Sequence, residues 1–418
     1  MKKTLCFMAM VSVQALFAQT LSLKDAVGKT LAYHPDVRTF MLKIQQAEQG
    51  YNAAYADYLP QLNLQASYSP TQTYILPVNG TFHTIDDTGW NAGVQLHQKV
   101  WDFAKTSALI EAAKLDEDIS RLSLNEVKAL LAFKVKSLYE LLVVQAEAVR
   151  VREKDLETKK AFYAQAQALV KQGLKTRADA TRFLAAVYAA EDSLAIARAS
   201  YEKAKSSLAL YMGVSLPATL TLQKDTIKKS LSDSPKKIES DVLAYNYKIQ
   251  MDRFGVEKGR QLHRSAKAAH YGSIDISASH NRFGTLNTYD TDTVTLSYNI
   301  PLYSGGRLSA QEQQAKIGYQ IAQEKRLSDE IALKEELHNL LIDIKRYAKT
   351  IRAKKAQLRS ANRNLSLLKA RYKEGLTTYI EVLDTTSIVL NAKLGVLEAY
   401  YLRSVALDRI AYLKGEIE

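Results

Sequence analysis

Apolar and polar residues alternate along four segments of this chain. In the first of them, LNLQAS at 62–67, every second residue is apolar and the others are Asn, Gln or Ser. This period of two is typical of strands with one apolar and one polar face. The pattern predicts strands at about 61–69, 88–100, 273–281 and 291–301. The stretch 70–87, with two prolines and an Asn-Gly pair, predicts a turn-rich connection.

A heptad pattern follows each pair of strands. Apolar residues recur at steps of four and three from Leu131 to Val170, and again from Leu333 to Tyr372. Such spacing predicts helices that supercoil against neighbouring helices. The sequence predicts long helices at about 104–172 and 307–374, each followed by a return helix, at about 178–212 and 379–414. A helix of the first span would be roughly 100 Å long.

The second half of the chain repeats the first. Gly173 and Gly375, where the long helices are interrupted, lie 202 residues apart (375 − 173), and many other positions match at this offset. One structural unit written twice is therefore expected. The boundaries predicted from this repeat are 19–215 for the first copy, 216–235 for a linker and 236–418 for the second copy.

The first 18 residues have the features of a secretory signal peptide. A basic start, MKK, precedes a short apolar run and the small residue Ala18. The alternative is a membrane anchor, but the apolar run is shorter than the roughly 20 residues that a spanning helix needs. Cys6, the one cysteine, would leave with the signal, so the mature chain has no thiol for a disulfide or a metal.

The net charge of +13 does not indicate a nucleic-acid partner. Lys and Arg are spread along the predicted helices with Asp and Glu between them, and an exported chain seldom meets nucleic acid.

Strands with one apolar and one small polar face suit a membrane barrel, whose outer side meets lipid. A small soluble sheet packed on the helices would show the same alternation. Within a membrane the sheet has to close, because every backbone N–H and C=O needs a partner. Four strands cannot close alone; two copies would supply eight strands and three copies twelve, which leaves room for a water-filled passage.

The chain resembles the TolC-like outer membrane efflux proteins, also called outer membrane factors, over nearly the whole mature sequence. Five segments carry the resemblance: AYHPDV, AYADYLPQLNLQASYS, VWDFAKTSALIEAAK, LYSGGRLSAQEQQAK and YKEGLTTYIEVLDTTSIVLNAKL. It implies a mainly α fold with a membrane β-barrel, in which a homotrimer forms a 12-stranded barrel and a long α-helical coiled-coil tunnel.

The same resemblance implies a location and partners. The protein would lie in the outer membrane of a Gram-negative bacterium, in contact with outer membrane lipid, and extend into the periplasm. There it would be the exit duct of a tripartite efflux or type I secretion system. Its partners would be a periplasmic adaptor (membrane fusion) protein and an inner-membrane pump of the resistance-nodulation-division or ABC type.

The family pattern also implies site residues. It places an adaptor-docking tip at the two turns, Gly173-Leu174 and Gly375-Leu376. It implies a periplasmic gate in which Glu381 and Asp384 form an acidic ring, while Asp179 and Tyr372 belong to the network that holds the tip closed. A family arginine two residues after the second glycine is replaced here by Thr377.

Local physics explains several of these residues without a gate. Glu381 and Asp384 lie one helical turn apart on one face, and three copies of each would attract cations. Carboxylates are also favoured in the first turn of any helix by its dipole. Gly173 and Gly375 could simply terminate helices.

The sequence contains no phosphate loop, no dinucleotide fingerprint, no HExxH and no cysteine cluster. Its seven histidines have no metal-ligand spacing. No enzyme activity, no cofactor and no metal site are therefore expected. Two alternatives to a duct remain open: an exported coiled-coil structural or adhesive protein without a channel, and an adaptor subunit of an export machine.

Overall fold

The computed structural model describes residues 20–217, 220–223 and 233–417. The predicted signal peptide, residues 1–18, lies outside the described residues, as does most of the predicted linker. The signal therefore stays a prediction.

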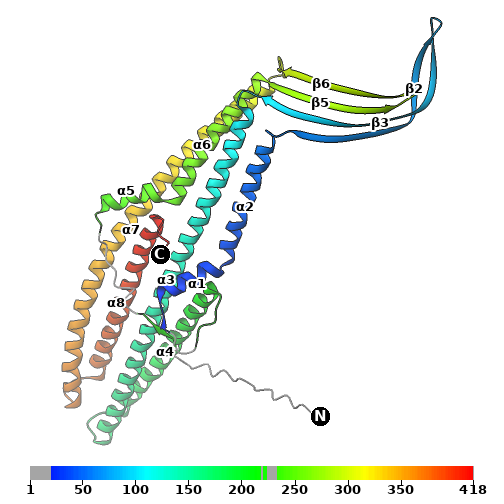
Figure 1. The fold of residues 1–418 in the computed structure, drawn as a ribbon. Helices are drawn as coiled ribbons and strands as arrows, with labels where there is room; N and C mark the ends of the chain where they lie inside the picture. Colours follow the sequence, from blue (N-terminus) through cyan, green and yellow to red (C-terminus); the bar gives the residue numbers. More distant parts are fainter. Residues whose placement is uncertain (1–19, 218–219, 224–232, 418) are drawn as a thin grey trace, which may run out of the picture. The chain divides into compact units, whose positions relative to one another are not determined.

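Helices account for most of the described chain (Figure 1). The elements, in chain order, are β1 (Thr20–Leu21), α1 (Leu23–Tyr33), α2 (Pro35–Ala56), β2 (Gln61–Val78), β3 (Thr81–Trp101), α3 (Lys105–Lys171), α4 (Arg177–Met212), β4 (Thr221–Leu222), α5 (Pro235–Tyr245), α6 (Tyr247–Ala268), η2 (Ala269–Tyr271), β5 (Ser273–Gly284), β6 (Thr288–Asn299), α7 (Arg307–Lys373) and α8 (Tyr379–Leu413). The long helices α3 and α7 have the same length, 67 residues, and start 202 residues apart (307 − 105). These equal lengths support the duplicated unit that the sequence predicts.

The chain divides into two compact units, each of which contains parts of both sequence halves. The strand unit comprises residues 38–126 and 243–333, and the helical unit comprises the rest of the described chain. Helices α3 and α7 contribute a segment to each unit.

The sheet of the strand unit is antiparallel with strand order β2-β3-β5-β6 (Figure 1). Partners across the sheet share a face, so the register fixes the two sides. Leu62, Leu96, Ala278 and Val294 lie in one row on the apolar side. Strands β2 and β6 are the edges, and neither has a second strand partner within the described chain.

The apolar side of the sheet also carries charge. His280 pairs with Asp292 across β5 and β6, with Nδ1 2.7 Å from Oδ1, and Arg282 lies 3.7 Å from Asp290. These ion pairs were not predicted from the sequence. They limit the apolar part of β6 to its later residues, such as Leu296.

The strands extend further than the sequence predicted. The stretch 70–87, expected to be rich in turns, is mostly strand, because β2 continues to Val78 and β3 begins at Thr81. Its Thr, Tyr, Ile and Val residues favour strands. A bulge and the Asn79-Gly80 turn accommodate the turn formers, and Asn79 and Gly80 both have positive φ.

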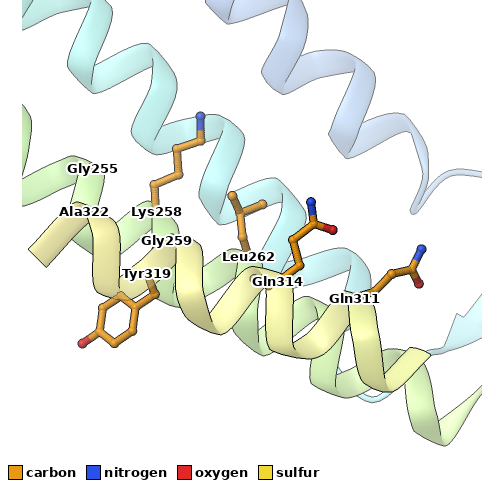
Figure 2. Close-up of a pocket in the computed structure, with 10 residues that line it drawn as sticks. Gly255, Lys258, Gly259, Leu262, Gln311, Gln314, Tyr319 and Ala322 are labelled. Atoms are coloured by element: carbon orange, nitrogen blue, oxygen red, sulfur yellow. The ribbon is translucent and has the colours of Figure 1, made fainter. Parts of the chain in front are cut away.

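Within the strand unit, α6 and α7 pack closely through small residues. Gly255, Gly259 and Gly318 line a groove of about 350 Å³ between them (Figure 2). A Cβ atom at Gly259 would lie 3.1 Å from the Tyr319 Cα atom, so glycine lets the two backbones approach. An ion pair from Lys258 Nζ to Asp116 Oδ1, 2.7 Å long, joins α6 to α3.

A second set of ion pairs joins α6 to α7. Lys325 on α7 donates to Asp252 on α6, at 2.5 Å, and to Asp329, at 2.9 Å. Lys248 donates to Asp329 as well, at 2.6 Å. Burial opposes ionisation of Asp329, but the hydrogen bonds from Lys248 and Lys325 lower its pKa to about 2.

In the helical unit, the heptad residues form buried clusters. One surrounds Val135, Tyr139 and Leu142 of α3, all fully buried. The Tyr139 hydroxyl donates to the Leu21 carbonyl at 2.7 Å and accepts from the Gln223 N–H at 2.9 Å. It thereby holds the short parallel pair β1-β4 against α3.

Candidate functional site: the two helix turns and the acidic pair

The turns that end α3 and α7 have the same hydrogen bonds. Leu174 N–H donates to the Leu169 carbonyl at 2.9 Å, and Leu376 N–H donates to the Arg371 carbonyl at 2.8 Å. With the second bond from each glycine N–H to the carbonyl three residues earlier, this is the Schellman motif. Gly173 and Gly375 occupy its left-handed position, with φ of +71° and +75°. Glycine is therefore favoured at both turns by backbone geometry alone.

Each turn presents a leucine to solvent. The exposed fraction is 62% for Leu174 and 68% for Leu376. Both follow the glycine directly, where the motif often places a hydrophobic residue against the preceding helix. These leucines instead remain largely uncovered within the chain.

The helices that follow the turns start with threonine caps. The Thr176 hydroxyl accepts from the Asp179 N–H at 3.3 Å, and the Asp179 carboxylate accepts from the Thr176 N–H at 3.1 Å, which forms a capping box. The Thr378 hydroxyl caps α8 by accepting from the Glu381 N–H, at 3.4 Å. Asp179 therefore has a structural role, and no hydrogen bond joins it to Tyr372 among the described residues.

The predicted acidic pair lies on the first turns of α8. Glu381 and Asp384 are both exposed. The Glu381 carboxylate accepts a hydrogen bond from the hydroxyl of Thr377, which is buried. Thr377, where the family has arginine, thus orients one member of the pair but brings no positive charge to it.

Tyr372 lies within an aromatic cluster rather than on the surface. Its ring is fully buried and lies 5.6 Å from the Phe183 ring and 6.5 Å from the Phe162 ring. Among the described residues its hydroxyl has no hydrogen-bond partner. Burial, together with the nearby Asp179 charge, raises the pKa of Tyr372 to about 12.

Lys175 connects the two turns, and it was not predicted from the sequence. Its Nζ donates to the Thr377 carbonyl at 3.2 Å and lies 5.6 Å from the centre of the Tyr372 ring. The repeat contains the signal that could have revealed it, because Lys175 and Thr377 are 202 residues apart and so occupy equivalent positions. The structure thus brings Thr377 and Tyr372 to the lysine of the first turn.

No cluster of three or more His, Cys, Asp or Glu side chains suited to a metal ion occurs in the described ranges. In the same ranges, no helix combines the length and hydropathy needed to cross a membrane.

A four-stranded antiparallel sheet and two long helices, each ended by a glycine turn, also occur in solved structures of outer membrane channels. The solved structure of the outer membrane protein VceC from Vibrio cholerae matches with a TM-score of 0.81, 18% identity and coverage of 95% of this chain and 97% of that one. A CusC structure matches with a TM-score of 0.82, 19% identity and coverage of 96% and 95%.

The family model described as outer membrane efflux protein matches residues 26–214 and 239–416. The chain belongs to this family. Its relatives include the outer membrane protein TolC of Escherichia coli K12, with 23% identity over 96% of this chain and 84% of TolC. The cation efflux system protein CusC of the same strain is 22% identical over 91% of this chain and 84% of CusC.

The chain is thus an outer membrane efflux channel of a Gram-negative bacterium, and it serves as an exit duct in tripartite efflux or secretion. The expected fold class is confirmed. The named relatives are channels rather than enzymes.

The buried Tyr372 predicts a specific loss of stability in alkali. A tyrosine whose folded pKa lies above its unfolded value keeps its proton in the native state while the unfolded state loses it. Its stabilising contribution is complete below pH 10 and declines as the pH rises toward about 12. Tyr372→Phe should therefore weaken the alkaline fall in thermal unfolding temperature over this window, as measured by circular dichroism of the purified protein. Tyr188→Phe, at a position 62% exposed, is the control; equal curves for the two variants would contradict the assignment.

Proposed function

We propose that three copies of this chain form a passive duct, with a 12-stranded barrel in the outer membrane and an α-helical tunnel in the periplasm. The duct would open toward a periplasmic adaptor and an inner-membrane pump of the resistance-nodulation-division or ABC type. It would perform no catalysis and need no cofactor. Transport would be driven by the pump, and the duct would select by its bore and its charge.

The observation that carries the proposal is the pair of open sheet edges. Strands β2 and β6 each pair on one side only within the described chain, and both edges would lie in lipid. Pairing β6 of one copy with β2 of the next satisfies both edges and closes a ring. Because α2 leads into β2 and α7 follows β6, this pairing also brings α2 of one copy beside α7 of its neighbour.

Exposed side chains on these two helices support the same contact. Within the single chain, Val37 is the one buried residue of α2, whereas Leu42 is 63% exposed. On α7, Ile321 and Ile331 are 62% and 67% exposed. A helix stabilised by tertiary packing needs a covered apolar face, and a neighbouring copy would provide it.

We propose that the exposed Leu174 and Leu376 form the surface on which the adaptor docks. Each follows a glycine turn with the same hydrogen bonds, so the two leucines are presented by similar backbones. Apolar side chains that remain exposed in this way are typical of interaction sites.

The acidic pair would act on ions that pass the tip. In a threefold arrangement, the exposed Glu381 and Asp384 of three copies would face one another and raise the local concentration of cations. Lys175 would supply the tie between the two turns of each chain, in place of the arginine that is absent at Thr377.

The duct as a whole is tested by recording from the purified protein in planar lipid bilayers, together with the mass of its detergent complex. Trimers that conduct ions support the proposal. A soluble monomer without conductance would instead favour the exported coiled-coil protein.

The sides of the sheet are tested by Leu296→Arg. Leu296 is 70% exposed on the apolar side and lies away from the His280–Asp292 pair. An arginine facing lipid should hinder insertion by about 2–4 kcal/mol if it lies at mid-bilayer, seen as less folded trimer in outer membrane fractions. Thr295→Arg, on the polar side, is the control and should assemble normally. Equal assembly of both variants would mean that the lipid-facing side is wrongly assigned.

The acidic ring is tested by combining Glu381→Ala with Asp384→Ala. Loss of these charges should reduce selectivity for cations over anions and weaken block by multivalent cations, both measured in single-channel recordings. Glu374→Ala removes the carboxylate that directly follows the end of α7 and should change selectivity less. Unchanged selectivity in the double variant would contradict the ring.

The tie between the turns is tested by Lys175→Met. Without the ammonium group, the bond to the Thr377 carbonyl is lost, so the tip should open more readily and the mean single-channel conductance should rise. Lys175→Arg should keep the wild-type behaviour, and Lys171→Met, at the last residue of α3 before the same turn, is the matched control. The tie is wrong if Lys175→Met conducts like the wild type.

A further inference from the structure

Strands β2 and β3 continue beyond the other two strands of the sheet. Strand β5 ends at Gly284, and its last partner on β3 is Trp90. The part of β3 from 81 to 89 pairs with β2 alone, so residues 70–89 form a two-stranded extension, called here the distal ribbon. Figure 1 shows that this ribbon turns away from the line of the sheet.

A bulge marks the start of the distal ribbon. Ser69 pairs with Gly89, and the next pair is Gln72 with Asp87, so β2 contains one residue more than β3 over this step. Pro70 lies within the bulge, where no ladder hydrogen bond from its nitrogen is needed. A shift of one residue exchanges the two faces of a strand. Beyond the bulge, the even-numbered residues of β2 therefore lie on the polar side of the sheet.

The surroundings of Gly89 confirm this exchange independently. A Cβ atom built at Gly89 would lie 2.1 Å from Gln72 Oε1 and 2.7 Å from the Tyr74 hydroxyl oxygen. Gly89 belongs to the polar side, two residues before Asn91. Tyr74 therefore leans over the polar side, and its hydroxyl donates to the Thr88 carbonyl at 3.2 Å.

The exchange places apolar residues where the sheet below has polar ones. On the polar side, the main sheet carries mainly Asn, Gln, Ser and Thr. The distal ribbon carries Tyr74, Leu76, Val78 and Ile85 on this side, beside the polar residues Gln72, Thr81, His83 and Asp87. Val78 and Ile85 are 45% and 43% exposed. The opposite side of the ribbon continues the apolar side of the sheet, with Ile75 and Phe82. Tyr74 and Leu76 are partly buried within the chain, whereas Val78 and Ile85 are exposed. These four residues are called here the ribbon cluster.

We infer that the distal ribbons of neighbouring copies pack against one another through this cluster and form a lid over the outer mouth of the duct. The inference rests on the proposed function, since it requires the polar side of the sheet to line a passage shared by several copies. Strand β2 is also the edge that would meet the next copy. If the polar side lines the shared passage, the ribbon clusters of three copies would face one another near its axis.

Stability considerations favour a second copy as the occupant. A two-stranded ribbon alone is marginally stable in water, and its unpaired edges invite association. Contact among identical ribbons buries Tyr74, Leu76, Val78 and Ile85 without needing another molecule. The lid would narrow the exit at the cell surface.

Cross-linking tests the contact. Val78→Cys, the one thiol expected in the mature chain, should be joined between copies on intact cells by a short membrane-impermeant bismaleimide. Thr84→Cys, on the opposite side of the same ribbon, should react without joining copies. Absence of the Val78→Cys product, or equal products from both variants, would overturn the lid.

Conductance tests the obstruction. Leu76→Asp should separate the ribbons and raise single-channel conductance several-fold, whereas Thr84→Asp should leave it unchanged. Wild-type conductance in Leu76→Asp would overturn the lid even if Val78→Cys is cross-linked. An amine-reactive cross-linker applied to the wild type distinguishes failure of the lid from failure of the duct. If it joins wild-type copies that conduct ions, a negative result concerns the ribbon alone, and if it finds monomers without conductance, the duct itself is wrong.

Discussion

Unpaired backbone at the edges of one sheet is the constraint on which the rest depends. Strands β2 and β6 each leave one edge without a partner within the described chain, and a membrane offers no water to satisfy it. A family member of this kind therefore reaches its working form through association. The same requirement accounts for the bare face of α2, which lies directly before β2, and for the exposed isoleucines of α7, which follows β6.

Much of the fold follows from residue periodicity. Heptads from Leu131 and from Leu333 predict long helices, and the structure places these at Lys105–Lys171 and Arg307–Lys373, with each end within one residue of the expected position. The strand ends were less predictable. Pro70 and Asn79-Gly80 are turn formers. In the structure Pro70 lies in a β-bulge, and Asn79-Gly80 forms the two-residue turn between β2 and β3. Local sequence does not reveal a bulge, because its effect is to shift pairing with a strand elsewhere.

For the candidate site, the sequence predicts the two helix turns but not the side-chain contacts around them. Gly173 and Gly375 are recognisable as helix ends, and both adopt the left-handed conformation. The capping role of Asp179 could have been inferred from Thr176 three residues earlier. The burial of Tyr372 depends on Phe162 and Phe183, which come from other helices. Lys175 reaches Thr377 across 202 residues of chain. The repeat marks these two positions as equivalent, but it does not show that they are in contact.

The difference between Lys175 and Thr377 has a consequence for symmetry. Two halves of equal helix length make the two turns of one chain nearly interchangeable in backbone, yet one turn carries an ammonium group and the other a hydroxyl bound to Glu381. In a ring of three such chains, the backbones of the six turns would therefore be related by approximate sixfold symmetry, whereas their side chains would have threefold symmetry only. A docking partner that recognises the backbone shape of the turns would find six equivalent positions. One that recognises their charge would find two alternating sets of three turns.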